Sequence, residues 1–251
     1  MKQTELTIPH LLTESCTQFA NHIALSFTDE PPITYAELLV EVRRVTAFLR
    51  KQGIEHGERI AILGENSPQW AIAYFAVTSL GAVVVPILPD FHTSEIHHVV
   101  RHSGAKIIFV SERFYYKVEE LEFKDFNSVI LLNDFSILNP KASKATLRKI
   151  IADGGKELRK IRSQVRDFVG IKHQTVKETD LASLIYTSGT TGHSKGVMLT
   201  HKNIAWNAIA SAKLPDITPT DRFLSILPMA HVYECTLGLV VPILRGAAIY
   251  F

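Results

Sequence analysis

Cysteine is scarce in this sequence, and its scarcity narrows the possible chemistry. Cys16 and Cys235 are the two cysteines among 251 residues, and they lie far apart along the chain. They have neither the spacing of a metal site nor that of a redox pair. We therefore expect two reduced thiols in a cytoplasmic protein.

A strong excess of charge is also missing. The formal net charge is +2, which gives no indication of a nucleic-acid or membrane partner. The N-terminal stretch MKQTELTIPHLL lacks the long apolar segment of a secretory signal. These absences favour a soluble protein.

One uncharged segment, residues 66–89, could imitate a membrane span. Ser67 and Pro68, however, predict the start of a helix, Gly81 predicts its end, and Pro86 predicts a further break. A spanning helix needs about 20 uninterrupted apolar residues. We therefore expect a buried helix, a turn and a strand at 82–85.

Short apolar runs alternate with amphipathic segments along the first 140 residues. Thr34 and Glu37 have the spacing of a capping box, which predicts a helix that Gly53 ends. Further helices are expected at 67–80 and 94–102, and strands at 23–27, 59–63, 82–85, 106–110 and 128–132. This alternation predicts an α/β fold with a parallel, doubly wound sheet covered by helices on both faces.

Residues 141–173 differ from the rest of the chain. Between Lys141 and Lys172 there are ten lysines and arginines against three acidic residues, with apolar residues at mostly helical intervals. We expect a basic helical connector between two subdomain-like parts at about 1–140 and 174–251. The alternative is peripheral contact of 141–172 with an anionic membrane surface.

The stretch YTSGTTGHSKGV, residues 186–197, connects an expected strand at 181–186 to another at 196–199. Glycine allows positive φ and close approach of a ligand, and consecutive N–H groups can form an anion-binding nest. Hydroxyl donors and a mobile cation complete the set, which suits the oxygens of a polyphosphate. The glycines are Gly189, Gly192 and Gly196, and the polar residues are Thr187, Ser188, Thr190, Thr191, Ser194 and Lys195. A flexible surface hairpin is the alternative.

A Walker A loop is excluded by the order of these residues. That motif needs Gly-Lys-Ser/Thr at the start of a helix, whereas here Ser194 precedes Lys195, and Gly196 begins an apolar strand.

The longer stretch YTSGTTGHSKGVMLTHKN resembles the phosphate-loop signature of the AMP-forming adenylate superfamily, which includes acyl-CoA synthetases, luciferases and peptide-synthetase adenylation domains. Ser194 stands where that pattern usually has proline, which should alter loop stiffness more than chemistry. Residues 33–87 and 223–251 are also similar to the family, so nearly the whole chain is covered. The variant His-Val-Tyr-Glu at 231–234 looks most like long-chain fatty-acyl-CoA synthetases.

The resemblance implies that a fatty acid, ATP and CoA react through an acyl-adenylate to give acyl-CoA, AMP and diphosphate. It implies that His231 is a catalytic residue beside the acyl and nucleotide pocket, and that Thr187 helps to hold Mg²⁺. The phosphates of ATP would be bound by Thr187, Ser188, Gly189, Thr190, Thr191, Gly192 and Lys195.

The resemblance also implies an incomplete enzyme. Members of the family continue past this point with further Mg²⁺, ribose and lysine sites and a C-terminal domain. We therefore expect an N-terminal portion that neither forms acyl-adenylate nor thioester by itself. The last residues, GAAIYF, are expected to form a strand with an exposed edge.

Other functions stay open at this point. The alternatives are another adenylate-forming ligase, an ATPase or phosphotransferase that uses the same loop, and a non-catalytic nucleotide- or acyl-binding module. His98 and His102 have a spacing that can share a metal, but Val99 breaks an H-E-x-x-H pattern, so a polar helix face is expected. His201 and Asn203 are expected at a helix start after Thr200.

Overall fold

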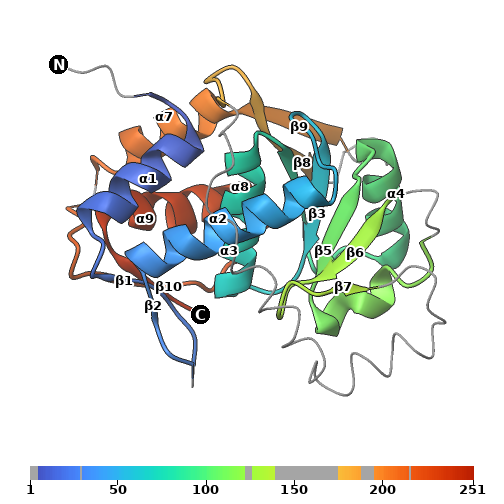
Figure 1. Cartoon of the computed structure of the whole chain (residues 1–251), viewed down its shortest axis with the longest axis horizontal. Coiled ribbons are helices and arrows are strands. Elements are labelled where there is room, and N and C mark those ends of the chain that lie inside the picture. The colour runs from blue at the N-terminus through green and yellow to red at the C-terminus, as the bar shows by residue number, and fades with distance from the viewer. Residues whose placement is uncertain (1–4, 29, 122–125, 139–174, 188–194, 215) are drawn as a thin grey trace.

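The computed structural model describes residues 5–28, 30–121, 126–138, 175–187, 195–214 and 216–251 (Figure 1). The helices are α1 (Ile8–Gln18), α2 (Tyr35–Lys51), α3 (Pro68–Leu80), α4 (Thr93–Ser103), α7 (His201–Ser211), α8 (Val232–Glu234), α9 (Val241–Arg245), the 3₁₀ helix η1 (Glu112–Lys117) and the π-helical segment η2 (Cys235–Val240). The strands are β1 (Ile23–Ser26), β2 (Ile33–Thr34), β3 (Arg59–Leu63), β4 (Val83–Ile87), β5 (Ile107–Val110), β6 (Ser128–Leu131), β7 (Ile137–Leu138), β8 (Leu181–Thr187), β9 (Lys195–Thr200), β10 (Arg222–Leu224) and β11 (Ala248–Tyr250).

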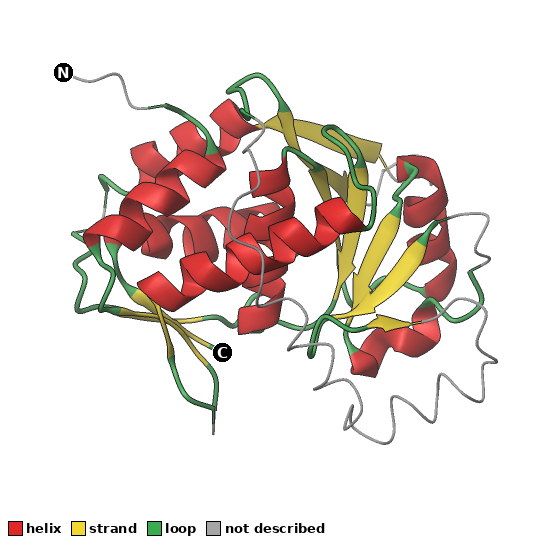
Figure 2. Cartoon of the chain, viewed as in Figure 1, coloured by secondary structure: helices red, strands yellow, loops and turns green. Residues whose placement is uncertain are grey.

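The larger sheet has seven strands in the order β7-β6-β5-β3-β4-β8-β9. Its inner strands are parallel, and the outermost pairs, β6–β7 and β8–β9, are antiparallel. Helices lie on both sides of this sheet (Figure 2). The doubly wound α/β fold predicted from the sequence is confirmed.

Alternate residues of the central strands enter two separate cores, as the two-residue period of a strand requires. Ile60 and Ile62 of β3 pack in the core that contains α1, α2, α3 and α7. Ala61 and Leu63 pack in the other, with α4 and η1. Both faces of β3 are therefore covered, which explains its continuous apolar run.

The smaller sheet has the order β10-β11-β1-β2, and β11 is parallel to both of its neighbours. The expectation that GAAIYF leaves an exposed edge is wrong, because β11 lies between β10 and β1. Its docking is reinforced by Tyr35, whose hydroxyl donates to the carbonyl of Ala247 at 2.8 Å. Its pairing with β1 joins residues more than 200 positions apart, so no local pattern shows it.

Both sheets combine strands from before and after residues 139–174. In the larger sheet Val84 of β4 pairs with Ser183 of β8, and in the smaller one Leu25 of β1 pairs with Ile249 of β11. The division into parts 1–140 and 174–251 stays a prediction, and strand pairing crosses it. The basic connector 141–173, with its predicted membrane contact, lies outside the described residues. Among the residues that the structure describes, no helix is long and apolar enough to cross a membrane.

The predicted helix signals are confirmed where they can be checked. Thr34 and Glu37 form the capping box of α2, Ser67 caps α3 with Pro68 behind it, and Gly81 ends α3 in the left-handed conformation. Pro86 does not break the following strand: it lies inside β4, paired with Ile62. β4 pairs with β8 at Val84, two residues before the proline. A proline, which has no N–H to donate, is tolerated in a strand where its neighbour does not need that hydrogen bond.

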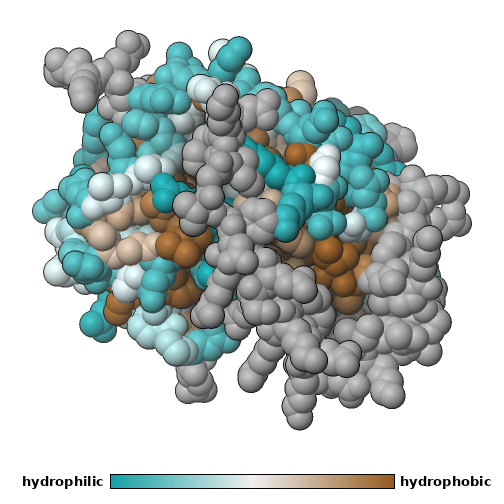
Figure 3. Space-filling view, in the orientation of Figure 1, coloured by the Kyte–Doolittle hydropathy of each residue, from teal (hydrophilic) through white to brown (hydrophobic). Residues whose placement is uncertain are grey.

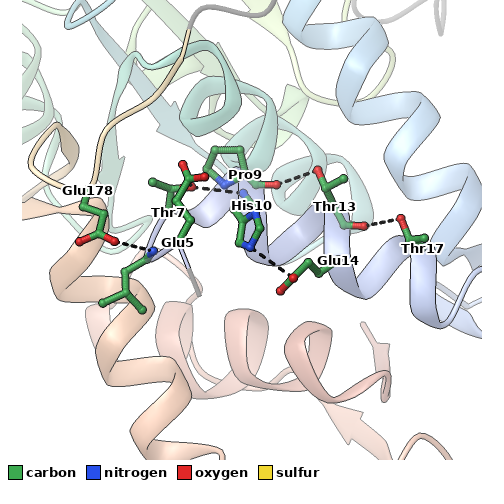
Figure 4. Close-up of polar contacts among 9 residues, drawn as sticks. Glu5, Thr7, Pro9, His10, Thr13, Glu14, Thr17 and Glu178 are labelled. Carbon is green, nitrogen blue, oxygen red and sulfur yellow. Dashed lines mark hydrogen bonds and ion pairs between the residues drawn. The ribbon is translucent and has the colours of Figure 1, made fainter. Parts of the chain in front are cut away.

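The first helix is fixed at its N-terminus by side chains from distant segments (Figure 4). Thr7 caps α1 by accepting from the N–H of His10, and the N–H of Leu6 donates to Glu178 at 3.0 Å. The N–H of Ile8 donates to Nδ1 of the buried His201, at the start of α7. His201 thus joins α1 to α7, which confirms a structural role at this helix start.

Candidate functional site

The glycine-rich loop connects two antiparallel strands, as the sequence predicts. Thr187 at the end of β8 is paired with Lys195 at the start of β9, and Tyr186 with Gly196. Both Thr187 and Lys195 are exposed. The hairpin therefore presents one hydroxyl and one ammonium group side by side where the loop begins and ends. The other predicted phosphate-binding residues, Ser188, Gly189, Thr190, Thr191 and Gly192, lie outside the described residues, as does Ser194.

Gly196 serves packing rather than backbone freedom. Its φ is not positive, so that part of the expectation is wrong. A Cβ at this position would lie 2.9 Å from a methyl group of Leu184 and 3.5 Å from the ring of Tyr186. Glycine therefore lets neighbouring side chains of β8 cross over β9.

Tyr186 ties the base of the loop to the end of α4. Its hydroxyl lies 2.7 Å from Nδ1 of His102, and the two rings meet edge to face. Burial raises the pKa of Tyr186, although Arg59 opposes the rise, so the phenol stays protonated. The His102 ring is thus engaged with Tyr186. The described residues contain no group of three His, Cys, Asp or Glu side chains that could hold a metal.

His231 follows the smaller sheet. The strand β10 ends at Leu224, and residues 225–230 form a loop that leads to His231, the N-cap of the short helix α8. Nδ1 of His231 accepts a hydrogen bond from the N–H of Tyr233 at 3.2 Å. A neutral ring that accepts at Nδ1 carries its proton on Nε2, so the exposed side chain offers a donor at Nε2.

The loop before His231 is held by a residue that the sequence analysis did not select. Asn66 follows β3, and its Nδ2 donates to Ser225 Oγ at 2.9 Å and to the carbonyl of Leu227 at 2.7 Å. Its Oδ1 accepts from the N–H of Met229 at 2.8 Å. One amide thus joins the larger sheet to the loop of the smaller one. The available signal was its position directly after the carboxyl end of a parallel strand, where ligand sites gather.

Glu234 continues this network into the interior. It is 8% exposed, and its Oε1 accepts from Ser225 Oγ at 3.2 Å. Burial raises the pKa of Glu234, partly offset by the Ser225 hydrogen bond. A Cβ at Gly238 would overlap the Glu234 carboxyl, so glycine makes room for it. Glu234 therefore stabilises the 225–230 loop from the protein interior, through Ser225, and is not placed to contact a substrate.

Large apolar side chains are exposed around His231. We call them the His231 apolar surface: Leu224, Ile226, Leu227, Val232 and Tyr233. Ile226 is 74% exposed. Contiguous exposed apolar side chains beside polar groups are typical of a ligand or interaction surface.

The two predicted parts of the site belong to different sheets. Thr187 and Lys195 are at the edge of the larger sheet, and His231 follows the smaller one. Within the described part of the chain, no hydrogen bond or ion pair joins either of them to His231.

Comparison with known proteins decides the family. Residues 12–251 match the family described as AMP-binding enzyme. The chain belongs to the AMP-binding enzyme family. This confirms the resemblance seen in the phosphate loop and over most of the sequence.

Two of the relatives that match this chain are named as CoA ligases. The long-chain-fatty-acid–CoA ligase of Bacillus subtilis (strain 168) is 29% identical over 92% of this chain. The indoleacetate–CoA ligase of Aromatoleum aromaticum is 30% identical over 81% of this chain. The chain spans 43% and 37% of the length of these two proteins.

Solved structures of this AMP-binding fold cover nearly the whole chain. The inhibitor-bound N-terminal domain of FACL13 from Mycobacterium tuberculosis matches with a TM-score of 0.78 and 24% identity, over 98% of this chain and 57% of that one. ATP-bound MatB from Rhodopseudomonas palustris matches with a TM-score of 0.73 and 22% identity, over 98% of this chain and 45% of that one. At these identities the likeness establishes the fold, and the roles of Thr187, Lys195 and His231 stay predictions.

Proposed function

We propose that this chain forms the nucleotide- and acyl-binding part of an AMP-forming ligase that joins a fatty acid to CoA. The reaction would proceed through an acyl-adenylate with release of diphosphate. The observation that carries the proposal is the β8–β9 hairpin, which sets Thr187 and Lys195 at the two ends of a loop rich in glycine and hydroxyl groups, in a chain of the AMP-binding family.

The charges of the reactants explain why such a loop is needed. A carboxylate and ATP are both anions, so their approach requires cations and amide dipoles. Lys195 would offset charge on the β- and γ-phosphates while the carboxylate attacks the α-phosphorus. As diphosphate leaves, the same residue would stabilise the charge that accumulates on it.

Mg²⁺ would fit Thr187 as one ligand among several. Mg²⁺ prefers oxygen ligands and usually keeps water and phosphate oxygens in its shell. A single exposed hydroxyl at the end of β8 suits that pattern. When bound, Mg²⁺ would neutralise phosphate charge, and Thr187 would set its position against Lys195.

The substrate class is supported by the surface around His231. The His231 apolar surface offers hydrocarbon contact next to an Nε2 donor, which suits a carboxylate with an apolar chain. His231 would donate to the carboxylate, while the loop fixed by Asn66 orients it. The relative from Bacillus subtilis is named for long-chain fatty acids and CoA.

The acceptor thiol has a second candidate. The chloroplastic relative AEE15 of Arabidopsis thaliana, 29% identical, is named as a ligase for long-chain fatty acids and acyl-carrier protein. Transfer to CoA or to a carrier-protein thiol requires the same acyl-adenylate, so the site described above serves both.

Equilibrium titration of the full chain with ATP and Mg²⁺ tests the proposal. We expect saturable binding that weakens at least about tenfold in Lys195→Ala, because one charge-assisted contact with phosphate is lost. Lys202→Ala is the matched control: this exposed lysine on α7 is paired with Glu178 at 3.7 Å and should not change the affinity. No ATP binding, or equal affinities in the two variants, would refute the nucleotide role.

Product analysis separates the alternatives. In the complete enzyme, release of diphosphate that depends on a fatty acid supports adenylation, whereas orthophosphate release without a carboxylic acid would indicate an ATPase or phosphotransferase. Binding of a fatty acid without any nucleotide binding would indicate a non-catalytic acyl-binding module.

A further inference from the structure

A cavity of about 300 Å³ lies apart from the phosphate hairpin and the His231 loop. Its walls come from α2, α3, the turn between β1 and β2, and the turn between β6 and β7. Figure 3 shows hydrophobic patches within the mostly hydrophilic face that carries α2 and α3. The volume is at the small end of the range for sites that bind small molecules, about 300–1,000 Å³.

The cavity adjoins a point where the topology of the larger sheet favours ligand binding. The chain leaves β3 toward α3 on one face, and leaves the neighbouring β5 toward η1 on the other. Crevices form outside the carboxyl ends of parallel strands where connections diverge in this way. The loops beyond β3, β5 and β6 meet there: Ser111 Oγ donates to Glu65 at 2.5 Å, and the N–H of Glu112 donates to Asn133 at 3.1 Å.

A buried hydroxyl in the cavity wall has no partner. Ser136 is 2% exposed, and its Oγ makes no hydrogen bond to any part of the chain that the structure describes. Its backbone is fixed, because its N–H donates to Asp134 and its carbonyl accepts from Leu131. Buried polar atoms are nearly always paired, so this hydroxyl in a cavity wall is a candidate contact for a bound group.

The adjacent turn is strained. Phe135 has a φ of 60°. Among the described residues it is the one residue other than glycine with a positive φ. Such a conformation in a bulky residue persists only where the surroundings hold it, and it is common at ligand sites. Here it sets Phe135 into the cavity wall between Asp134 and Ser136.

The charges of the wall select the kind of ligand. The wall contains three carboxylates and one cation, Arg44, whose Nη1 is paired with Glu41 at 2.6 Å. The carboxylates are those of Glu37, Glu41 and Asp134. Glu37 is engaged in capping α2 at Thr34. Asp134 accepts one hydrogen bond, from the Ser136 N–H, and lies two residues from the unpaired Ser136 hydroxyl, so we take it as the carboxylate for a cation. Phe48, Ile72 and Phe135 provide apolar wall.

We propose that this cavity binds a small amphipathic amine. Its ammonium group would be held by Asp134 and Ser136, and its apolar part would pack against Phe48, Ile72 and Phe135. The inference is independent of the phosphate hairpin, since no residue is shared between the two sites.

Calorimetric titration of the full chain with three probes of one shape tests the charge selection. Phenethylamine should bind saturably with one site per chain, 2-phenylethanol at least about tenfold more weakly, and 3-phenylpropionate more weakly still. Equal affinities for the three probes, or no saturable binding of the amine, would overturn the proposal.

Variants of the cavity wall test its position. Asp134→Asn keeps an oxygen that can accept from the Ser136 N–H, so the turn should fold, and amine affinity should fall at least about tenfold. Ser136→Ala is the second variant and should give a smaller loss. Glu120→Gln is the control, because it removes the charge of an exposed acidic residue outside the cavity. It should not change the amine affinity. Unchanged amine affinity in both wall variants would contradict the proposal.

One further measurement distinguishes the cavity from the phosphate hairpin. Lys195→Ala should lose ATP affinity and keep amine affinity, so failure of one site would not be mistaken for failure of the other.

Discussion

The two sheets use apolar residues in different ways. β3, β4 and β5 of the larger sheet are almost entirely buried, whereas β10 at the edge of the smaller sheet is largely exposed. Both regions have apolar sequences, RIAIL in the first and RFLSIL in the second. Apolar residues therefore form the core in the larger sheet, whereas near β10 they form an exposed surface beside a candidate site.

The largest expected effect comes from one substitution made in both regions. Ile62 is fully buried in β3, and Ile226 is 74% exposed near His231. Ile62→Ala should lower the free energy of unfolding by about 2–5 kcal/mol, and Ile226→Ala by under about 0.5 kcal/mol. Urea denaturation measures both. Similar losses would break the distinction between core and surface.

A pH dependence should arise from the junction of α1 and α7 beside the larger sheet. Burial lowers the pKa of His201 to about 4, with Asp180 opposing and His56 adding to the effect. The unfolded chain therefore takes up this proton at higher pH than the folded one, and stability should fall as pH drops from about 6.5 to about 4. The full loss is about 3 kcal/mol.

Replacement of the histidine isolates this contribution. In His201→Gln the slope of unfolding free energy against pH between about 4 and 6.5 should become shallower, whatever the change in overall stability. A wild-type slope retained in this variant would show that another group titrates. The Asp180 carboxyl acts in a lower window: burial would raise its pKa, but hydrogen bonds from Lys177 and His56 lower it overall.

The link between the sheets gives a smaller effect. Asn66→Ala leaves Ser225 Oγ, the Leu227 carbonyl and the Met229 N–H without this amide, and should cost about 1–3 kcal/mol. Hydrogen exchange should accelerate in residues 225–231 and stay unchanged in β3. Faster exchange across both sheets would mean that Asn66 supports the whole fold and not this loop.

A small effect is also expected at the hairpin. Gly196→Ala places a methyl group 2.9 Å from the end of the flexible Leu184 side chain, which can shift, so the loss should be about 1 kcal/mol or less. Thermal unfolding measures it. A loss as large as that of Ile62→Ala would show that the edge hairpin is packed as tightly as the central strands.

Sequence alone could predict the larger sheet because its signals are local. Continuous apolar runs, the Thr34 capping box and Gly81 each lie within a few residues of the structure that they determine. Pro86 misled because the tolerance of a strand for proline depends on its neighbours. The central position of β11 depends on pairing with β1, more than 200 residues away.

The candidate site likewise has parts that local sequence signals predict and parts that depend on distant segments. The phosphate loop was visible from composition and order, and its hairpin ends were confirmed. Asn66 was not found, because a single asparagine looks ordinary until the loop of the smaller sheet lies against it. For His231, the contact with Tyr233 that fixes its ring is local, but the exposure of the surrounding apolar residues depends on the edge position of β10.

Hydrogen exchange of the full chain with and without ATP and Mg²⁺ tests the central claim most directly. If the hairpin holds the phosphates, amides of residues 181–200 should become protected on addition of nucleotide, while the already buried β3 and β5 should not change. Protection confined to other segments, with residues 181–200 exchanging as before, would contradict the account.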